Sequence, residues 1–320
     1  MKNSIEEMIT VSNSALEESV AIGRVLGKYT QGEKGPALII TAGVHGNETS
    51  GIFAFRRVWQ KLKQFNLPIK GELTGLAGNM AALSKNARLI DKDLNRVCFL
   101  ETERRLEAGE DLGYQESREF SALIEEINQA QHGMIIKVFF LDLHTTSSAS
   151  QPYISVNRDK GSYEFAKKFP LFIVKGIEDY IPGHMDYYLN HKGHNGCTIE
   201  AGQHESLNSI ENHEAAIWLA LVNIGCMDER DVPDFALHYD VLKKSVTDTN
   251  LSFEVIYKYD IQEKEFFQMK PGYVNFQKIS KGEILATSDG RNIVSEWDGR
   301  IFMPLYQSEG KDGFFVVQEC

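Results

Sequence analysis

The chain has 320 residues, of which 42% are hydrophobic and 25% charged, so it is long enough for one large core and a smaller unit. The formal net charge of −11 argues against a nucleic-acid partner, because that partner requires a basic face. No run approaches the roughly 20 apolar positions of a membrane span, and residues 1–23 lack the apolar core of a signal peptide. The four cysteines lie far apart, so we expect a reduced, cytoplasmic protein without a membrane partner.

Up to about residue 230, segments typical of strands alternate with segments typical of helices. Short apolar runs predict strands over residues 37–42, 72–77, 135–143 and 196–200. Apolar residues at helical spacing predict helices over residues 48–63, 115–130 and 208–225. This alternation predicts an α/β domain over residues 1–230 with a largely parallel sheet.

Residues 235–320 follow a different pattern, in which short β-like runs are divided by turn signals such as Asp-Gly and Pro-Gly. The runs cover residues 253–257, 265–268, 273–276, 284–287, 292–296, 300–304 and 314–318. They predict a small all-β module. Its sequence pattern is similar to that of the hairpins of barrel-sandwich domains.

Two segments carry residues that bind zinc in other proteins. His45 and Glu48 follow the first predicted strand in the run GVHGNE, and His144 ends the strand over residues 135–143. Zinc accepts imidazole nitrogen and carboxylate oxygen, and a catalytic site often has three protein ligands. Asp142 points to the same side of its strand as His144 and is a candidate to orient a ligand. The alternatives are a polar loop for the first segment and a core histidine for the second.

Two further segments carry candidate catalytic groups. Glu200 ends the predicted strand over residues 196–200, where a buried carboxylate is costly unless it is paired or functional. Such a group beside a zinc-activated water can transfer its proton. Arg88, Asn95 and Arg96 lie in a polar run between Glu48 and His144, and arginine binds carboxylates in a bidentate manner. A structural ion pair and a solvated charged loop are the respective alternatives.

Taken together and in this order, the segments AGVHGNETSG, GNMAALSKNARLIDKDLNR, FLDLHTTSS and GCTIEAG resemble the succinylglutamate desuccinylase/aspartoacylase family. This family is a branch of the zinc carboxypeptidase superfamily. The similarity covers approximately residues 35–225. It implies a zinc carboxypeptidase-like mixed sheet flanked by helices, with the C-terminal β module as a smaller unit.

The resemblance also implies a role for each matching residue. The metal ligands are His45, Glu48 and His144, which would hold one zinc ion per chain. The catalytic groups are Glu200, which activates the water, and Arg88, which polarises the scissile carbonyl. Asn95 and Arg96 would bind the substrate carboxylate, and Asp93 would support their loop.

The implied reaction is hydrolysis of the amide bond of a small, anionic N-acyl amino acid by a desuccinylase or deacylase. A metallocarboxypeptidase acting on peptides and a non-enzymatic metabolite-binding protein of the same fold are the alternatives. The resemblance leaves room for a homo-oligomer.

Because of two departures from the family pattern, the identity of the substrate's acyl group is not predicted. Aspartoacylases carry an arginine shortly before the catalytic glutamate, whereas here only Lys192 is available as a substitute. They also contribute a tyrosine from the β module, for which Tyr306 is the nearest candidate. The nearby pair His191 and His194 has metal-ligand spacing, but its polar surroundings favour a loop.

Overall fold

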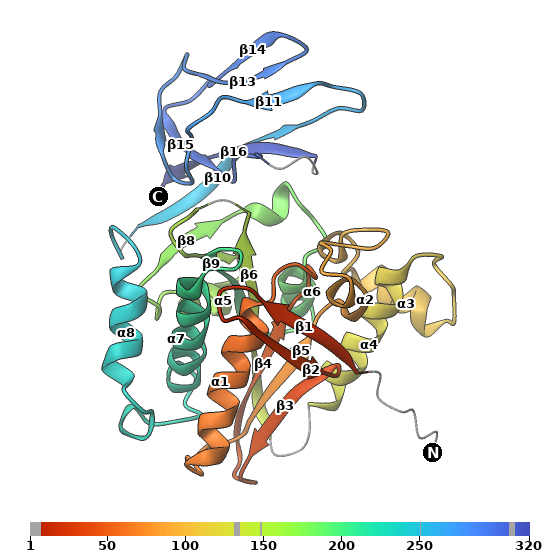
Figure 1. The fold of residues 1–320 in the computed structure, drawn as a ribbon, viewed down its shortest axis with the longest axis vertical. Coiled ribbons are helices and arrows are strands. Elements are labelled where there is room, and N and C mark those ends of the chain that lie inside the picture. The colour runs from red at the N-terminus through yellow and green to blue at the C-terminus, as the bar shows by residue number, and fades with distance from the viewer. Residues whose placement is uncertain (1–7, 131–134, 148, 250, 307–310) are drawn as a thin grey trace.

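The computed structural model describes residues 8–130, 135–147, 149–249, 251–306 and 311–320. These residues form an α/β part and a β-rich C-terminal module at one end of it (Figure 1). Among them, no helix combines the length and the apolar character that crossing a membrane requires.

Within these described ranges, one sheet of 11 strands runs through both parts of the molecule. The α/β part supplies β3 (Val25–Thr30), β4 (Gly35–Ala42), β5 (Glu72–Ala77), β6 (Ile135–Thr146), β7 (Tyr153–Val156), β8 (Phe172–Lys175) and β9 (Asn195–Gln203). The central order β5-β4-β6-β9 is parallel, whereas β3 and β7 pair antiparallel with β5 and β9. The sheet is therefore mixed, as the resemblance implied.

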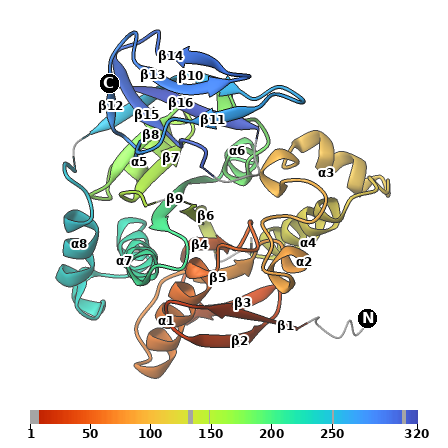
Figure 2. The same cartoon turned by 45° about the horizontal axis from the view of Figure 1, so that its top comes forward.

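Helices cover both faces of this sheet. One face packs against α1 (Ser50–Gln64), α7 (Leu207–Asn223) and α8 (Phe235–Lys244), and the other against α3 (Leu100–Glu107), α4 (Gln115–Gln129) and α6 (Met185–His191) (Figure 2). Alternate side chains of β4 enter the two cores, because Leu38 and Ile40 face the first and Ala37 and Ile39 face the second. A strand buried on both faces explains the unbroken apolar run in the sequence.

The predicted strands and helices of the α/β part are confirmed, with ends that differ by a few residues. No strand was predicted for the N-terminal hairpin of β1 (Ile9–Asn13) and β2 (Glu18–Ile22), or for β3. The remaining short elements are α2 (Met80–Ser84), η1 (Leu94–Arg96), α5 (Lys160–Ala166), η2 (Ile177–Asp179) and η3 (Glu229–Asp231).

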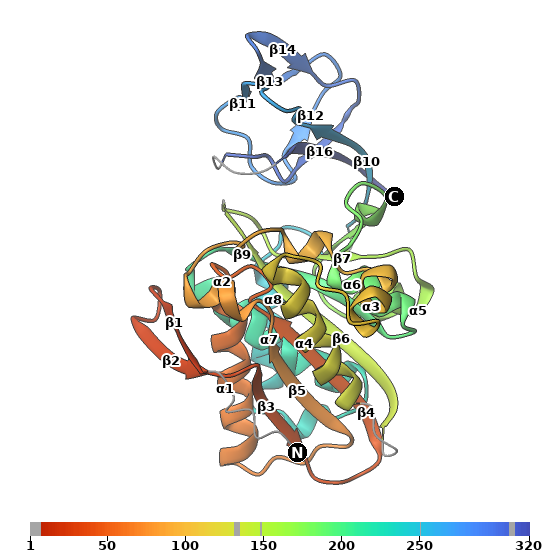
Figure 3. The same cartoon turned by 90° about the vertical axis from the view of Figure 1, so that its right-hand side faces the viewer.

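The C-terminal module continues the sheet of the α/β part. Its first strand, β10 (Ser252–Asp260), pairs parallel with β8 and antiparallel with β16 (Asp312–Glu319). The other strands are β11 (Phe267–Met269), β12 (Lys278–Ile279), β13 (Ile284–Ser288), β14 (Arg291–Val294) and β15 (Gly299–Phe302). Strands β11, β13 and β14 form a separate three-stranded sheet farther from the helices (Figure 3).

One predicted strand of the module is wrong. Residues 273–276 have irregular backbone with a turn at residues 275–276 rather than a strand, and Phe276 has a φ of +65°. A positive φ interrupts extended backbone, and β-propensity alone gives no sign of it. The aromatic ring of Phe276 packs instead against Tyr153, with ring centroids 5.3 Å apart, so its apolar character serves the contact between the two parts.

Candidate metal centre and its cavity

Three candidate metal ligands converge at the carboxyl ends of two neighbouring strands. Strands β4 and β6 pair in parallel, with Ala42 opposite Leu143, so the loop after β4 emerges beside His144. Gly43 opens this loop with a φ of +73°, a conformation that glycine adopts without strain. The loop places His45 and Glu48 against His144, and the potential ligand atoms lie within 4.8 Å of one another. All three side chains are buried.

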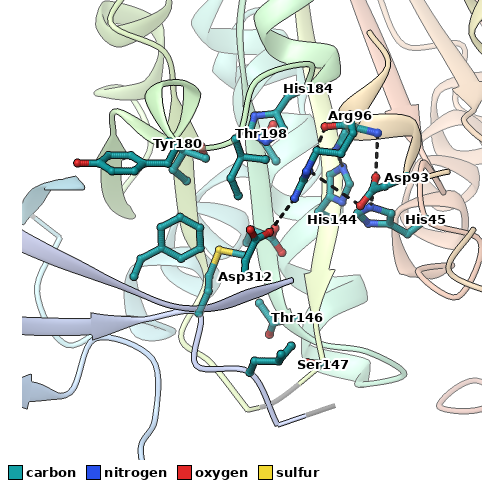
Figure 4. A pocket seen from close by; sticks show the side chains of 18 of the residues that line it. His45, Asp93, Arg96, His144, Thr146, Ser147, Tyr180, His184, Thr198 and Asp312 are labelled. Atoms are coloured by element: carbon teal, nitrogen blue, oxygen red, sulfur yellow. Dashed lines mark hydrogen bonds and ion pairs between the residues drawn. The ribbon is translucent and has the colours of Figure 1, made fainter. Parts of the chain in front are cut away.

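Carboxylates fix the orientation of both histidine rings. Nδ1 of His45 lies 2.8 Å from Oε1 of Glu48, and Nδ1 of His144 lies 3.1 Å from Oε2 of the same carboxylate. The Nε2 atoms point the other way, toward Asp93 at 3.1 Å and Asp142 at 3.0 Å. Metal-bound histidines commonly donate their second ring nitrogen to a carboxylate in this manner. Figure 4 shows His45 and His144 on the same side of the cavity, beside Asp93.

The charges of this cluster suit a cation. Burial raises the pKa of Glu48, but the charges of His45 and His144 outweigh burial and hold that pKa well below its usual value. Burial lowers the pKa of His144, whereas the charges of Asp142 and Glu48 raise it well above its usual value. Glu48 therefore stays ionised, and a cation held between the two imidazoles would replace the positive charge that balances this carboxylate. Two imidazole nitrogens and one carboxylate are a donor set that fits a divalent zinc-type cation.

Glu200 lies next to the cluster on strand β9. It is the register partner of His144 on one side and of Tyr153 on β7 on the other. Its Oε2 atom is enclosed and has no hydrogen-bond partner among the described residues. Burial raises the pKa of Glu200 to about 7, although the charge of His144 opposes the shift and that of Glu48 adds to it. A carboxyl group with this pKa can accept and donate a proton near neutral pH.

The arginine segment lies over the same cluster. The Arg88 guanidinium lies 3.5 Å from Glu48 and 3.3 Å from Asp93. Asn95 accepts a hydrogen bond from the backbone of Met185, and its amide nitrogen lies 3.3 Å from Nε2 of His144. These contacts place both side chains within reach of a molecule bound at the metal ligands.

A buried glutamate on α4 anchors this segment. The carboxylate of Glu116 accepts hydrogen bonds from the backbone amides of Ile90, Asp91 and Lys92, at 2.7 to 3.3 Å, and the side chain is fully buried. Glu116 was not among the predicted site residues, because nothing in the local sequence distinguishes it from the other glutamates of an amphipathic helix.

A cavity of about 630 Å³ connects these groups. All seven predicted site residues line it, namely His45, Glu48, Arg88, Asn95, Arg96, His144 and Glu200. The C-terminal module contributes another part of the wall, including Lys258, Asp260, Asn275, Met303, Asp312 and Phe315. No local sequence pattern points to these module residues, because long-range contacts such as the pairing of β10 with β8 bring them to the cavity.

Other candidates from the sequence lie elsewhere. Lys192 pairs with Glu103 at 3.0 Å, and His191 is exposed on α6. The hydroxyl of Tyr306 donates a hydrogen bond to the carbonyl of Lys270. Neither these three residues nor His194 belongs to the cavity wall in the described part of the chain. The described residues therefore place neither Lys192, the possible substitute for the missing arginine, nor Tyr306, the candidate module tyrosine, at the cavity.

Comparisons with known proteins agree with this geometry. The family model of the succinylglutamate desuccinylase/aspartoacylase catalytic domain matches residues 34–220. The chain therefore belongs to the succinylglutamate desuccinylase/aspartoacylase family.

Individual relatives are distant. A succinylglutamate desuccinylase from Photorhabdus laumondii subsp. laumondii is 36% identical over 61 residues, 19% of this chain and 19% of that protein. That match spans only about a fifth of the relative's length. One from Ectopseudomonas mendocina is 22% identical over 85% of this chain and 80% of its own length. A crystal structure of a succinylglutamate desuccinylase/aspartoacylase from Rhodobacter sphaeroides has the same fold, with a TM-score of 0.67 and 17% identity over 98% of this chain and 94% of that chain.

Proposed function

We propose that the protein is a zinc-dependent hydrolase that cleaves the amide bond of a small N-acyl amino acid, as a desuccinylase or deacylase does. The observation that carries this proposal is the position of Glu200 beside His144 on adjacent strands, directly next to the buried His45–Glu48–His144 cluster. Residues 1–230 would supply the reacting groups, and residues 235–320 would close the cavity above them.

The metal cluster supports zinc through its donor atoms and their surroundings. His45, Glu48 and His144 would hold the ion, and Asp93 and Asp142 would keep the two imidazole rings in place. When bound by these residues, a zinc ion would act as a Lewis acid and would make a water molecule acidic enough to ionise near neutral pH.

The remaining chemistry belongs to side chains of the chain. Glu200 would remove a proton from the attacking water and later donate it to the leaving nitrogen, a cycle that suits its pKa of about 7. Arg88 would stabilise the negative charge that develops on the carbonyl oxygen. Asn95 and Arg96 would hold the substrate carboxylate, since both side chains line the same cavity.

The position of the module favours a small substrate over a peptide. A metallocarboxypeptidase needs an open cleft in which a chain extends away from the metal, whereas here Met303, Asp312 and Phe315 of the module form part of the cavity wall. A cavity of about 630 Å³ has the size of a metabolite site. A purely binding role does not account for the enclosed Oε2 atom of Glu200, which has no hydrogen-bond partner among the described residues.

The test is a hydrolysis assay of the zinc-loaded chain with a panel of N-acetyl and N-succinyl amino acids. Glu200→Gln should keep stoichiometric zinc and lose turnover by roughly 10²–10⁴-fold, because general acid–base catalysis contributes about that much. Glu211→Gln, at an exposed position of α7, is the matched control and should retain full activity. Full turnover by Glu200→Gln, or release of C-terminal residues from peptides instead, would contradict the proposal.

A further inference from the structure

A carboxylate from the C-terminal module forms an ion pair with Arg96, the arginine proposed to bind the substrate carboxylate. Asp312, the first residue of β16, places Oδ2 2.9 Å from Nη2 of Arg96. Figure 4 shows the two side chains reaching toward each other from opposite sides of the cavity. Their exposed fractions are 26% and 35%, so the pair borders the open space that a ligand would enter.

The second oxygen of Asp312 has a different partner. Oδ1 lies 3.2 Å from Nζ of Lys258, which is mostly buried. The same ammonium group also contacts Asp260 at 2.6 Å and donates a hydrogen bond to the carbonyl of Tyr180. Asp312 therefore bridges two cations, and it would keep Lys258 as a partner if it released Arg96.

The cations of the cavity wall are largely engaged within the protein. Arg96 lies 3.9 Å from Asp93 in addition to its contact with Asp312, and Arg88 contacts Glu48 and Asp93. A substrate carboxylate that binds Arg96 would come to rest beside the carboxylate of Asp312. Two like charges on one guanidinium repel each other, and the repulsion is strengthened in a partly buried site.

We propose that Asp312 is a specificity-determining residue, which competes with the substrate carboxylate for Arg96. The inference rests on the proposed function in that it takes Arg96 as the carboxylate-binding group. Substrates with a carboxylate at this position must displace Asp312 toward Lys258, whereas a neutral group at the same position leaves the Asp312–Arg96 pair intact. The C-terminal module thus selects substrates by charge through this one side chain.

The experiment compares binding of a carboxylate and of its neutral amide. The zinc-loaded chain carrying Glu200→Gln prevents turnover, and calorimetry gives the dissociation constant of each N-acetyl amino acid and of its α-carboxamide. Adding Asp312→Asn removes the competing charge at nearly constant shape. The best-bound carboxylate should then bind about tenfold more tightly, which is the size of one partly exposed charge-assisted hydrogen bond. Binding of the carboxamide should stay unchanged.

Asp240→Asn is the matched control, because the side chain of this α8 residue is half exposed, pairs only with Lys244 among the described residues and lies away from the cavity. Asp312→Ser serves as a second variant if Asp312→Asn does not fold. An unchanged ratio of the two dissociation constants would overturn the proposal, and so would a complete lack of saturable binding. Failure of the proposed function gives a different result, in which the wild-type chain binds these compounds and does not hydrolyse them.

Discussion

His144 and Glu200 are direct register partners on the adjacent parallel strands β6 and β9. Partners in a sheet project to the same side, so the pairing fixes the distance between a candidate metal ligand and the candidate base. Both groups stand on strands of the central sheet rather than on loops. The scaffold therefore holds the two in place independently of each other, and each can be altered while the other keeps its position.

Loss of one metal ligand should abolish stoichiometric metal binding. His45→Ala leaves only Glu48 and His144 of the buried cluster, and two ligands do not make a complete zinc site. Elemental analysis after dialysis should show well below one zinc per chain. His191→Ala, at an exposed histidine outside the cavity wall, is the control and should retain the metal. Retention of stoichiometric zinc by His45→Ala would refute its assignment as a ligand.

Asp142 should tune metal affinity without touching the ion. Its carboxylate lies 3.0 Å from Nε2 of His144 and also accepts a hydrogen bond of 2.6 Å from Thr41. Asp142→Asn weakens the acceptor that orients the ring, so zinc affinity should fall roughly 10–100-fold. Competition with a chelator of known affinity measures this change. Equal zinc affinities of the variant and the wild-type chain would rule out this role.

Glu116 should act on catalysis through the position of Arg88. Glu116→Gln removes the charge that holds the amides of Ile90, Asp91 and Lys92, and it replaces one acceptor oxygen by a donor. The free energy of unfolding should drop by about 1–3 kcal/mol, the cost of mispairing buried polar groups. Turnover of the best panel substrate should fall while zinc content stays at the wild-type level.

The control for Glu116 is Glu125→Gln, on an exposed position of the same helix. It should change neither urea unfolding nor turnover. If Glu116→Gln loses stability and yet keeps the wild-type turnover number, the loop does not position Arg88.

Asp186 should make the protein less stable as pH rises. This cavity-wall residue is 2% exposed, and burial, helped by the charge of Asp142, raises its pKa to about 7 from the usual 3.8. Below pH 3.8 the carboxyl group is protonated in both states and has no effect. Between the two values the unfolded chain releases the proton and the folded chain keeps it, so folding is progressively disfavoured. Above about pH 7 the loss levels off at roughly 4 kcal/mol as an upper bound.

Urea unfolding of the wild-type chain and of Asp186→Asn at several pH values between 5 and 8 measures this contribution. The variant should lack the part of the stability loss that Asp186 causes, and its advantage over the wild-type chain should grow with pH. Parallel pH profiles of the two proteins would show that Asp186 does not titrate in this range.

The sequence predicted the central sheet well because its strands are buried on both faces. Continuous apolar runs such as that of β4 need no tertiary information to be identified. No prediction covered the hairpin of β1 and β2, because its short strands are half exposed and mix polar with apolar residues. The predicted strand over residues 273–276 is wrong because aromatic residues favour strands, and the residue type does not indicate that Phe276 has a positive φ.

By itself, the sequence determined which residues are candidates for the chemistry, namely the histidines, glutamates and arginines at predicted strand ends and in the loop between them. A strand end fixes where a side chain emerges, and parallel strands deliver their carboxyl ends to one edge. Only the tertiary structure decided which groups meet from distant parts of the chain. Glu116 under the arginine loop and Asp312 on Arg96 depend on how helices and the module pack. Such contacts follow from long-range geometry, which local sequence patterns do not encode.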